Sequence, residues 1–174
     1  MAISLYDVSV TSFLQVVGAM EGVLDRGLAH ATEHNIDPQD LVGARLVDNM
    51  LPLAFQVASV AHHSLGAIEG CKAGKFGPPG GGASATYADL QKLLSDARTG
   101  LLALTPDEVN ALEGQPVIFE LPGFKIPFKA EGFLMSFSIP NLHVHAATAY
   151  DILRIKGTPL GKRDYLGALR VNAG

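Results

Sequence analysis

The sequence has one cysteine, few charges and no long hydrophobic run, and each shortage excludes a class of protein. The single Cys71 rules out an intramolecular disulfide, as expected for the reducing cytoplasm. Only 17% of the residues are charged, the net charge is -4 and the Lys and Arg residues are scattered, which argues against a nucleic-acid partner. No apolar run is long enough to span a membrane, and the N-terminus lacks the basic segment and apolar core of a signal peptide.

Motifs for nucleotide binding and for a serine nucleophile are also missing. The Gly-rich segment 74–84 begins Gly74-Lys75 like a phosphate-binding loop. Glu69, however, stands where the first Gly of such a loop should be, and Phe76 stands where it needs Ser or Thr. Neither a G-x-S-x-G segment nor a paired-Gly dinucleotide fingerprint occurs. We therefore interpret residues 74–84 as a mobile crossover loop.

The sequence does contain a high share of apolar residues. They make up 48% of the 174 residues, enough for one globular domain over residues 1–174 with a substantial core. So little charge beside so much apolar surface also suggests that a second subunit covers part of the molecule. We expect a homodimer in the cytoplasm.

The apolar residues recur at steps of three and four, which predicts long helices. Four stretches show this pattern, at about residues 4–34, 48–72, 86–101 and 131–157. The pattern changes to period two on either side of Pro122-Gly123, at residues 117–121 and 124–129, which predicts a β-hairpin. The expected fold is an all-α four-helix bundle with a small β-hairpin before the last long helix.

Two features of these helices break the usual rules. Gly18 and Gly22 lie one turn apart in the first helix, where each costs about 1 kcal/mol relative to Ala, so we expect a neighbouring helix to approach closely there. Pro140 lies inside the last helix, where it removes a backbone hydrogen bond, so we expect a kink that frees the carbonyl of Ser136.

The last helix also carries the best candidate for a functional site. Asn141, His145 and Thr148 share one stripe of it, and Gln56 lies on an otherwise apolar face of the second helix. Facing helices of a bundle can share a polar pocket. One imidazole and two amides are a poor set of metal ligands, so a hydrogen-bonded His–Asn–Gln network is favoured over a metal site.

The histidines can be placed further. We expect His145 to be buried, hydrogen-bonded to Gln56 or Asn141, and neutral near pH 7, because desolvation disfavours the imidazolium. His62 and His63 point about 100° apart on a helix, so they cannot both bind one metal ion; we expect one at the edge of the core and the other in water.

Three segments carry a resemblance to a known family: SLYDVSV at the start, DNMLPLAFQV in the second helix, and IPNLHVHAATAYDILRIKGTPLGKRDYLG near the end. Together with the order of the helices and hairpin, they resemble the DinB-like (DinB/YfiT) superfamily of four-helix bundles. Within it, the chain is most similar to an uncharacterised branch, domain of unknown function 1993.

The resemblance implies a site as well as a fold. Many DinB-like proteins are metal-dependent, thiol-dependent transferases or hydrolases in which three His bind one divalent ion such as Zn or Ni. Aligning the family's Leu-Arg dipeptide with Leu153-Arg154 places two of these ligands at Asn141 and His145, and the third falls near Gln56. The sequence thus keeps one of the three expected ligands, His145.

Two functions follow from this reading. The first is a small-ligand-binding or structural homodimer without a cofactor, which lost the metal site and keeps a pocket around Gln56, Asn141, His145 and Thr148. The alternative is a DinB-like enzyme that uses His145 as a base or as the single protein ligand of a divalent ion.

Overall fold

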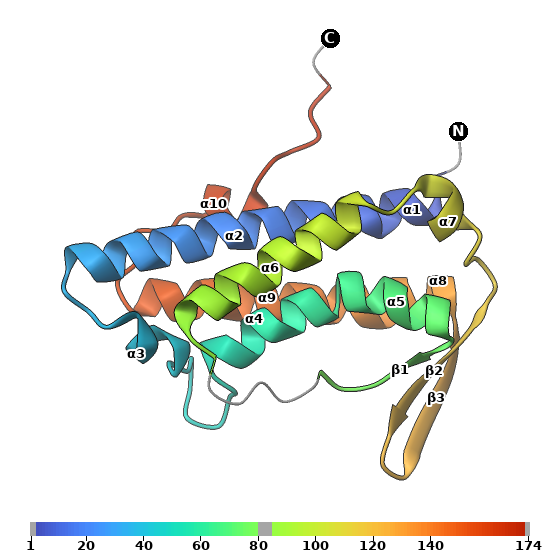
Figure 1. Ribbon diagram of the computed structural model, residues 1–174, viewed down its shortest axis with the longest axis horizontal. Helices are drawn as coiled ribbons and strands as arrows, with labels where there is room; N and C mark the ends of the chain where they lie inside the picture. The colour runs from blue at the N-terminus through green and yellow to red at the C-terminus, as the bar shows by residue number, and fades with distance from the viewer. Residues whose placement is uncertain (1–2, 80–84, 173–174) are drawn as a thin grey trace.

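The chain forms a bundle of four long helical units with a small sheet at one end (Figure 1). The structure is a computed structural model that describes residues 3–79 and 85–172. Around the bundle, α2 (Val10–Glu33) packs against α6 (Tyr87–Leu102), and α6 packs against α4 (Leu53–His62) and α5 (Leu65–Ala73). The ring is closed by α9 (Ile139–Ile155), which contacts both α4 and α2. The predicted all-α bundle is confirmed.

Each unit contributes a stripe of large apolar side chains to the core between them. The largest that are fully buried include Phe13, Met20, Leu24, Leu53, Ile68, Leu90, Leu94, Leu101, Phe133, Leu134 and Leu142. Short elements precede, connect or follow the long helices: α1 (Leu5–Val8), α3 (Pro38–Val42), α7 (Pro106–Asn110), α8 (Ala130–Phe133), the π-helical turn η1 (Leu134–Ser138) and α10 (Lys162–Leu166). Among the described residues, no helix has the length and apolar composition needed to cross a membrane.

The α4–α5 unit and α6 run in the same direction along the bundle (Figure 1). The chain between them therefore has to return along the length of the bundle. This return is the segment predicted as a crossover loop. It leaves α5 through Gly74, whose φ of +71° suits a residue without a Cβ, and residues 80–84 lie outside the described part of the chain.

Two predicted helices are each broken once, at a buried serine. Ser9 separates α1 from α2 and donates its hydroxyl to the carbonyl of Leu5 (2.6 Å). Ser64 separates α4 from α5 and donates to the carbonyl of Val60 (2.7 Å). A hydroxyl that bonds back to the preceding turn competes with the helix, so the prediction of two unbroken helices was wrong here. In addition, α4 begins later than predicted because Pro52 is its N-cap.

The last helix contains the irregularity expected near Pro140, in a specific form. Its chain runs from α8 through η1 into α9, and the N–H of Ile139 donates to the carbonyl of Leu134, five residues back. This single π turn lies immediately before the proline, which falls in the first turn of α9, where its missing N–H costs little. The π turn also turns Ser138 toward α4, which matters for the site.

The sheet has three strands. The predicted hairpin is confirmed as β2 (Pro116–Leu121) and β3 (Phe124–Lys129), joined at Gly123 with a φ of +79°. A third strand, β1 (Lys75–Phe76), pairs parallel with β2. It was not predicted, because two residues are too few to show a period of two.

A cluster of aromatic rings attaches this sheet to the bundle. Phe76 from β1, Phe119 and Phe128 from the hairpin, and Phe133 and Phe137 from the last helix form one cluster with ring centroids 4.8 to 6.4 Å apart. An isolated hairpin is marginal in water, so this cluster accounts for its stability.

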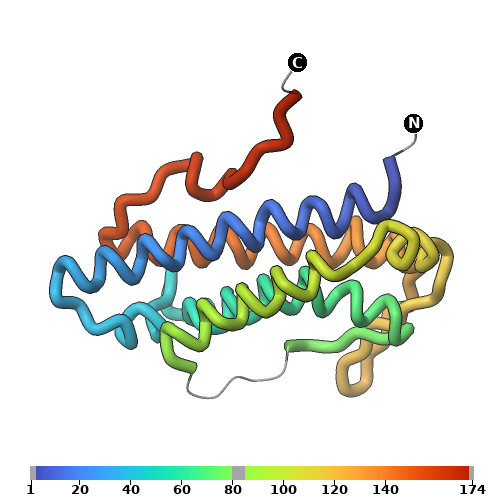
Figure 2. The backbone as a smooth tube through the Cα atoms, turned by 45° about the horizontal axis from the view of Figure 1, so that its top comes forward, coloured from blue at the N-terminus to red at the C-terminus, as the bar shows by residue number. Residues whose placement is uncertain are grey.

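The segment after α9 folds back along the first long helix (Figure 2). The amide of Gln15 donates to the carbonyl of Leu166 (2.9 Å), and Arg26 pairs with Asp164 (3.2 Å). Gly167 lies so close to α2 that a Cβ there would be 2.9 Å from the Cβ of Ala19. Thus α10 packs on the outer face of α2 and is fixed there by a hydrogen bond and an ion pair.

Close helix approach occurs at a glycine other than the predicted pair. A Cβ on Gly22 would meet nothing within 4 Å, and one on Gly18 would meet only the Arg98 side chain at 3.8 Å. By contrast, a Cβ on Gly27 would collide with the hydroxyl of Tyr87 and lie 3.2 Å from Leu153. The expectation for Gly18 and Gly22 was therefore wrong, and Gly27 is where α2, α6 and α9 meet.

This contrast gives a matched pair of substitutions in one helix. Gly27→Ala should lower the free energy of unfolding by about 1–3 kcal/mol, because α6 and α9 must move apart. Gly22→Ala should raise it by up to about 1 kcal/mol, because alanine favours the helix and the site is exposed. Urea unfolding followed by circular dichroism measures both. Equal effects of the two substitutions would contradict the packing described for Gly27.

Candidate functional site

Gln56 and His145 are brought together as predicted, and their contact fixes the state of the imidazole. The Gln56 amide donates through Nε2 to the carbonyl of Leu51 (2.8 Å), which leaves its Oε1 facing His145 Nδ1 at 2.8 Å. An oxygen can only accept, so Nδ1 carries the proton. His145 therefore has a lone pair on Nε2, and no described residue forms a hydrogen bond with that atom.

His63 is held in the same way, at the break between α4 and α5. The hydroxyl of Ser138 donates to the carbonyl of His63 (3.1 Å), so its oxygen accepts from His63 Nδ1 (3.3 Å). This reciprocal pair joins the helix break to the π turn. The ring of His63 lies nearly parallel to that of His145, 14° between planes and 5.8 Å between centroids.

Burial keeps these imidazoles neutral. Desolvation, with smaller repulsion from His62 and His145, lowers the pKa of His63 to about 3. Desolvation also lowers the pKa of His145 from its ordinary value. The expectation of a neutral His145 bonded to Gln56 agrees with this geometry, whereas its ring is only half-buried rather than buried.

The other two predicted residues lie nearby without joining the network. Asn141 donates its amide to the carbonyl of Phe137 in its own helix (2.7 Å). Thr148 is buried, one turn beyond His145. The edge of the Phe55 ring packs against His145, with centroids 5.7 Å apart. The cluster is thus a small polar network enclosed by aromatic rings.

The donor set does not suit the three-imidazole metal site implied by the family resemblance. Two of the three positions are amides, and the Gln56 oxygen already accepts the His145 proton. Within residues 3–79 and 85–172, no three His, Cys, Asp or Glu side chains lie close enough to share an ion. His63 adds a second imidazole, but in the described part of the chain no third ligand of a type that holds divalent metals is placed to share an ion with these two.

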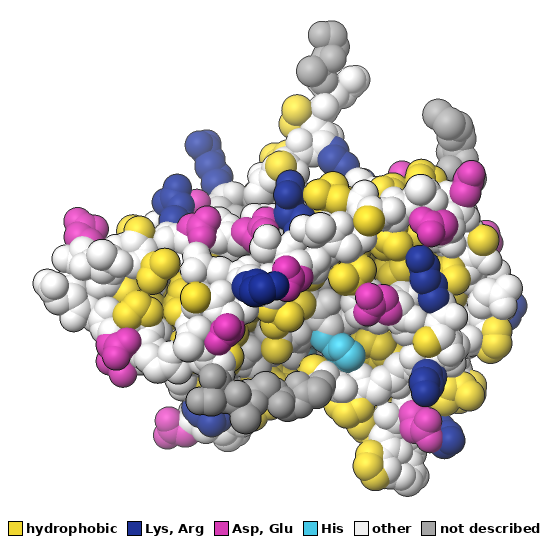
Figure 3. Space-filling view, in the orientation of Figure 1, with side chains coloured by type: hydrophobic (Ala, Val, Ile, Leu, Met, Phe, Trp, Pro, Cys, Tyr) yellow, Lys and Arg dark blue, Asp and Glu magenta, His cyan; other side chains and the backbone are white. Residues whose placement is uncertain are grey.

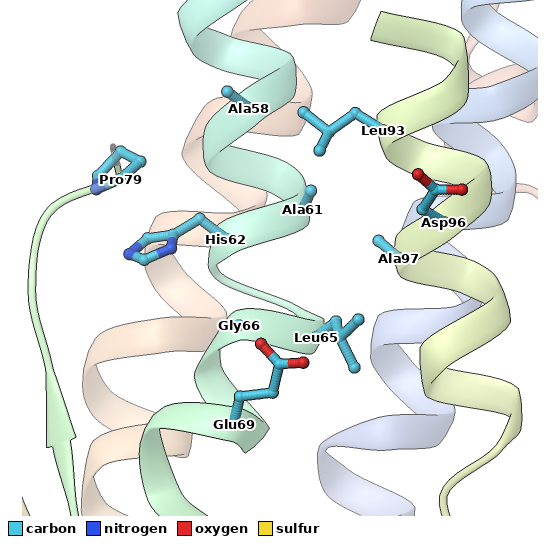
Figure 4. A pocket seen from close by; sticks show the side chains of 10 residues that line it. All are labelled: Ala58, Ala61, His62, Leu65, Gly66, Glu69, Pro79, Leu93, Asp96 and Ala97. Carbon is cyan, nitrogen blue, oxygen red and sulfur yellow. The ribbon is translucent and has the colours of Figure 1, made fainter. Parts of the chain in front are cut away.

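An apolar hollow opens on the other side of α4. It is a groove of about 450 Å³ between α4, α5 and α6, bordered by Pro79 from the segment after β1. Figure 3 shows hydrophobic side chains within it, with acidic side chains around it and a histidine on its floor. Its lining consists of Ala58, Ala61, His62, Leu65, Gly66, Glu69, Pro79, Leu93, Asp96 and Ala97 (Figure 4).

His62 links this groove to the polar cluster. Its Nε2–H donates to the carbonyl of Gly77 (2.7 Å), and its ring stacks on Phe76 with centroids 4.2 Å apart. The rings of His62 and His63 are 5.4 Å apart, so the three imidazoles of His62, His63 and His145 form a continuous row. His63 is buried, whereas His62 is half-buried against Phe76, so the expectation that one of the two lies in water was wrong.

The sequence predicted the contact between Gln56 and His145, but it predicted neither the place of His63 beside them nor the groove. His63 lies seven residues after Gln56, two turns along the same stripe, and that spacing could have added it to the predicted site. The groove has no such signal, because Ala and Leu residues that line a hollow have the same spacing as residues that fill a core.

The helical bundle with its small sheet defines a DinB-like fold. The crystal structure of a DinB family member protein from Shewanella denitrificans superposes with a TM-score of 0.81. It is 25% identical in sequence, over 98% of this chain and 96% of that one. The family model described as domain of unknown function (DUF1993) matches residues 5–166, so the chain belongs to that family. No curated protein sequence matches it.

The role of the Gln56–His145 pair can be tested through stability. His145→Ala should lower the free energy of unfolding by about 1–3 kcal/mol, because the buried Gln56 oxygen loses its donor. Val144→Ala, at the exposed neighbouring position of α9, is the control and should change it by less than about 0.5 kcal/mol. Equal losses in the two variants would show that the hydrogen bond contributes nothing.

Proposed function

We propose that this protein binds a small molecule without a metal ion, in the groove between α4, α5 and α6. The observation that carries the proposal is the groove itself. Its volume of about 450 Å³ lies in the range of small-molecule sites, and its lining combines apolar side chains with a few polar ones.

A second hollow extends the groove toward the start of α4. It measures about 420 Å³ and shares Ala58, Pro79 and Leu93 with the first. A ligand longer than one hollow could therefore lie along the face of α4. Gln56, His63 and His145 have a structural part in this proposal, because they hold α4 against the last helix from the opposite side.

A metal-free enzyme is the second candidate, favoured by the protonation state of His145. A neutral imidazole with Nδ1–H held by Gln56 and a free Nε2 lone pair is the arrangement of a general base. No nucleophile is bonded to it among the described residues. One divalent ion per chain in protein purified without a His tag would instead favour the metal-dependent alternative.

We also propose a cytoplasmic homodimer. Large apolar side chains remain exposed, among them Leu102, Met135 and Ile155 at 49–59%, and a partner subunit would cover such surface. The single Cys71 is buried and reduced, which suits the cytoplasm. Light scattering that returns the mass of one chain at micromolar concentration would contradict the dimer.

Ligand binding can be tested with N-phenyl-1-naphthylamine, a neutral dye that fluoresces when it leaves water. We expect the wild-type protein to bind about one dye per chain. Ala58→Phe should weaken binding at least about tenfold, because the ring would fill the part shared by both hollows. Ala29→Phe, at an exposed alanine of α2, is the control and should leave binding unchanged. Absent binding, or equal binding by all three proteins, would refute the proposal.

A further inference from the structure

The walls of the groove determine which part of a ligand they can hold. The surface within it is made of small and branched apolar side chains from α4, α5 and α6, including Ala58, Ala61, Leu65, Leu93 and Ala97. Such walls offer no hydrogen bond, so they favour an apolar body that leaves water.

The charged residues of the groove are all of one sign. Glu69 on α5 and Asp96 on α6 lie on its two walls (Figure 4), and Asp89 lines the adjoining hollow. No Lys or Arg is among the described lining of either hollow, although the chain has 13 of them. The groove therefore complements a positive charge and repels a negative one.

These three carboxylates differ in whether another group of the protein already bonds to them, and so in how available they are to a cationic ligand. Asp89 caps α6 by accepting from the backbone N–H of Thr86 (2.8 Å). Asp96 pairs with Lys92 one turn earlier, an exposed contact of the kind that is worth little. Glu69 is exposed and forms no ion pair within the described residues. Glu69 is thus the first contact available to a cation, and Asp96 is the second.

His62 does not oppose a cation in this groove. Its Nε2–H is engaged by the carbonyl of Gly77, and burial lowers the pKa of its ring below the ordinary value. The imidazole is therefore uncharged at neutral pH. The nearby His63, also uncharged, adds no positive charge from the core side.

We propose that the groove binds a small molecule with an apolar body and a cationic amine head, its body along Ala58, Leu65 and Leu93 and its head at Glu69 and Asp96. This inference rests on the proposed function, since it assumes that the groove binds small molecules at all. It adds the chemical class of the ligand, an apolar amine, to that proposal.

Displacement of the neutral dye N-phenyl-1-naphthylamine by three eight-carbon compounds tests the inference. Octylammonium should displace the dye at a concentration about three to ten times lower than 1-octanol does, as expected for one or two exposed charge contacts. Octanoate should be weaker than 1-octanol. The advantage of octylammonium should shrink as sodium chloride is raised, because salt screens exposed charges.

Neutral variants locate the charge contact. Glu69→Gln should remove most of the preference for octylammonium over 1-octanol, Asp96→Asn a smaller part, and the double variant all of it. Glu33→Gln, which removes an exposed carboxylate at the end of α2, should change nothing. In all variants 1-octanol itself should displace the dye as it does from the wild type, which shows that the groove is intact.

The outcomes distinguish a failure of the cationic-head inference from a failure of the proposed small-molecule binding. If the dye binds and the three compounds displace it equally, or octanoate displaces it best, the groove binds small molecules but the cationic head is wrong. If the dye does not bind at any protein concentration, the proposed function itself fails. If dye binding disappears as the protein associates at higher concentration, a second copy of the chain occupies the groove, and the small-molecule ligand is refuted.

Discussion

The structure depends on one hydrogen bond at the buried C-terminal end of α4, the bond that the carbonyl of His63 accepts. Where Ser64 breaks the second helical unit, the carbonyl of His63 loses its regular partner inside the core, and an unpaired buried carbonyl is costly. The hydroxyl of Ser138 supplies the missing bond and accepts one from the His63 ring. The π turn in the last helix presents that serine. The break, the π turn and the buried imidazole therefore depend on one another. Phe137 lies in the same π turn, so the aromatic cluster that attaches the sheet depends on this turn as well.

Local signals explain how much of the fold could be read from the sequence. Ser4, Thr86 and Thr105 are each followed three residues later by Asp or Glu, and each forms the capping box that this spacing predicts. The hairpin likewise turns at Pro122-Gly123. These features are readable because they depend on residues within one turn of each other. The helix breaks were missed for the opposite reason. A serine inside an apolar helical pattern is compatible with a continuous helix, and only its burial against another element decides whether its hydroxyl bends the chain.

The candidate site divides in the same way. The meeting of Gln56 with His145 follows from two polar residues on facing apolar stripes, since each needs a partner once buried. The groove follows from no pattern of residue types. It exists because side chains as small as Ala58, Ala61 and Ala97 do not fill the space between α4, α5 and α6. The apolar periodicity of the sequence shows only which sides of the helices face one another. It does not show whether the side chains between them fill the space.

The packing of α10 on α2 has a consequence for the folding of the chain during its synthesis. Gln15 and Leu166 are hydrogen-bonded across 151 residues of sequence, and Arg26 is paired with Asp164. A chain leaves the ribosome N-terminus first, so α2 emerges well before α10, and the face of α2 that α10 covers stays uncovered until then. During synthesis that face, including the surface around Ala19 that Gly167 later covers, is open to other partners. In the interval between the synthesis of α2 and that of α10, a chaperone or a second nascent chain can reach this face of the bundle.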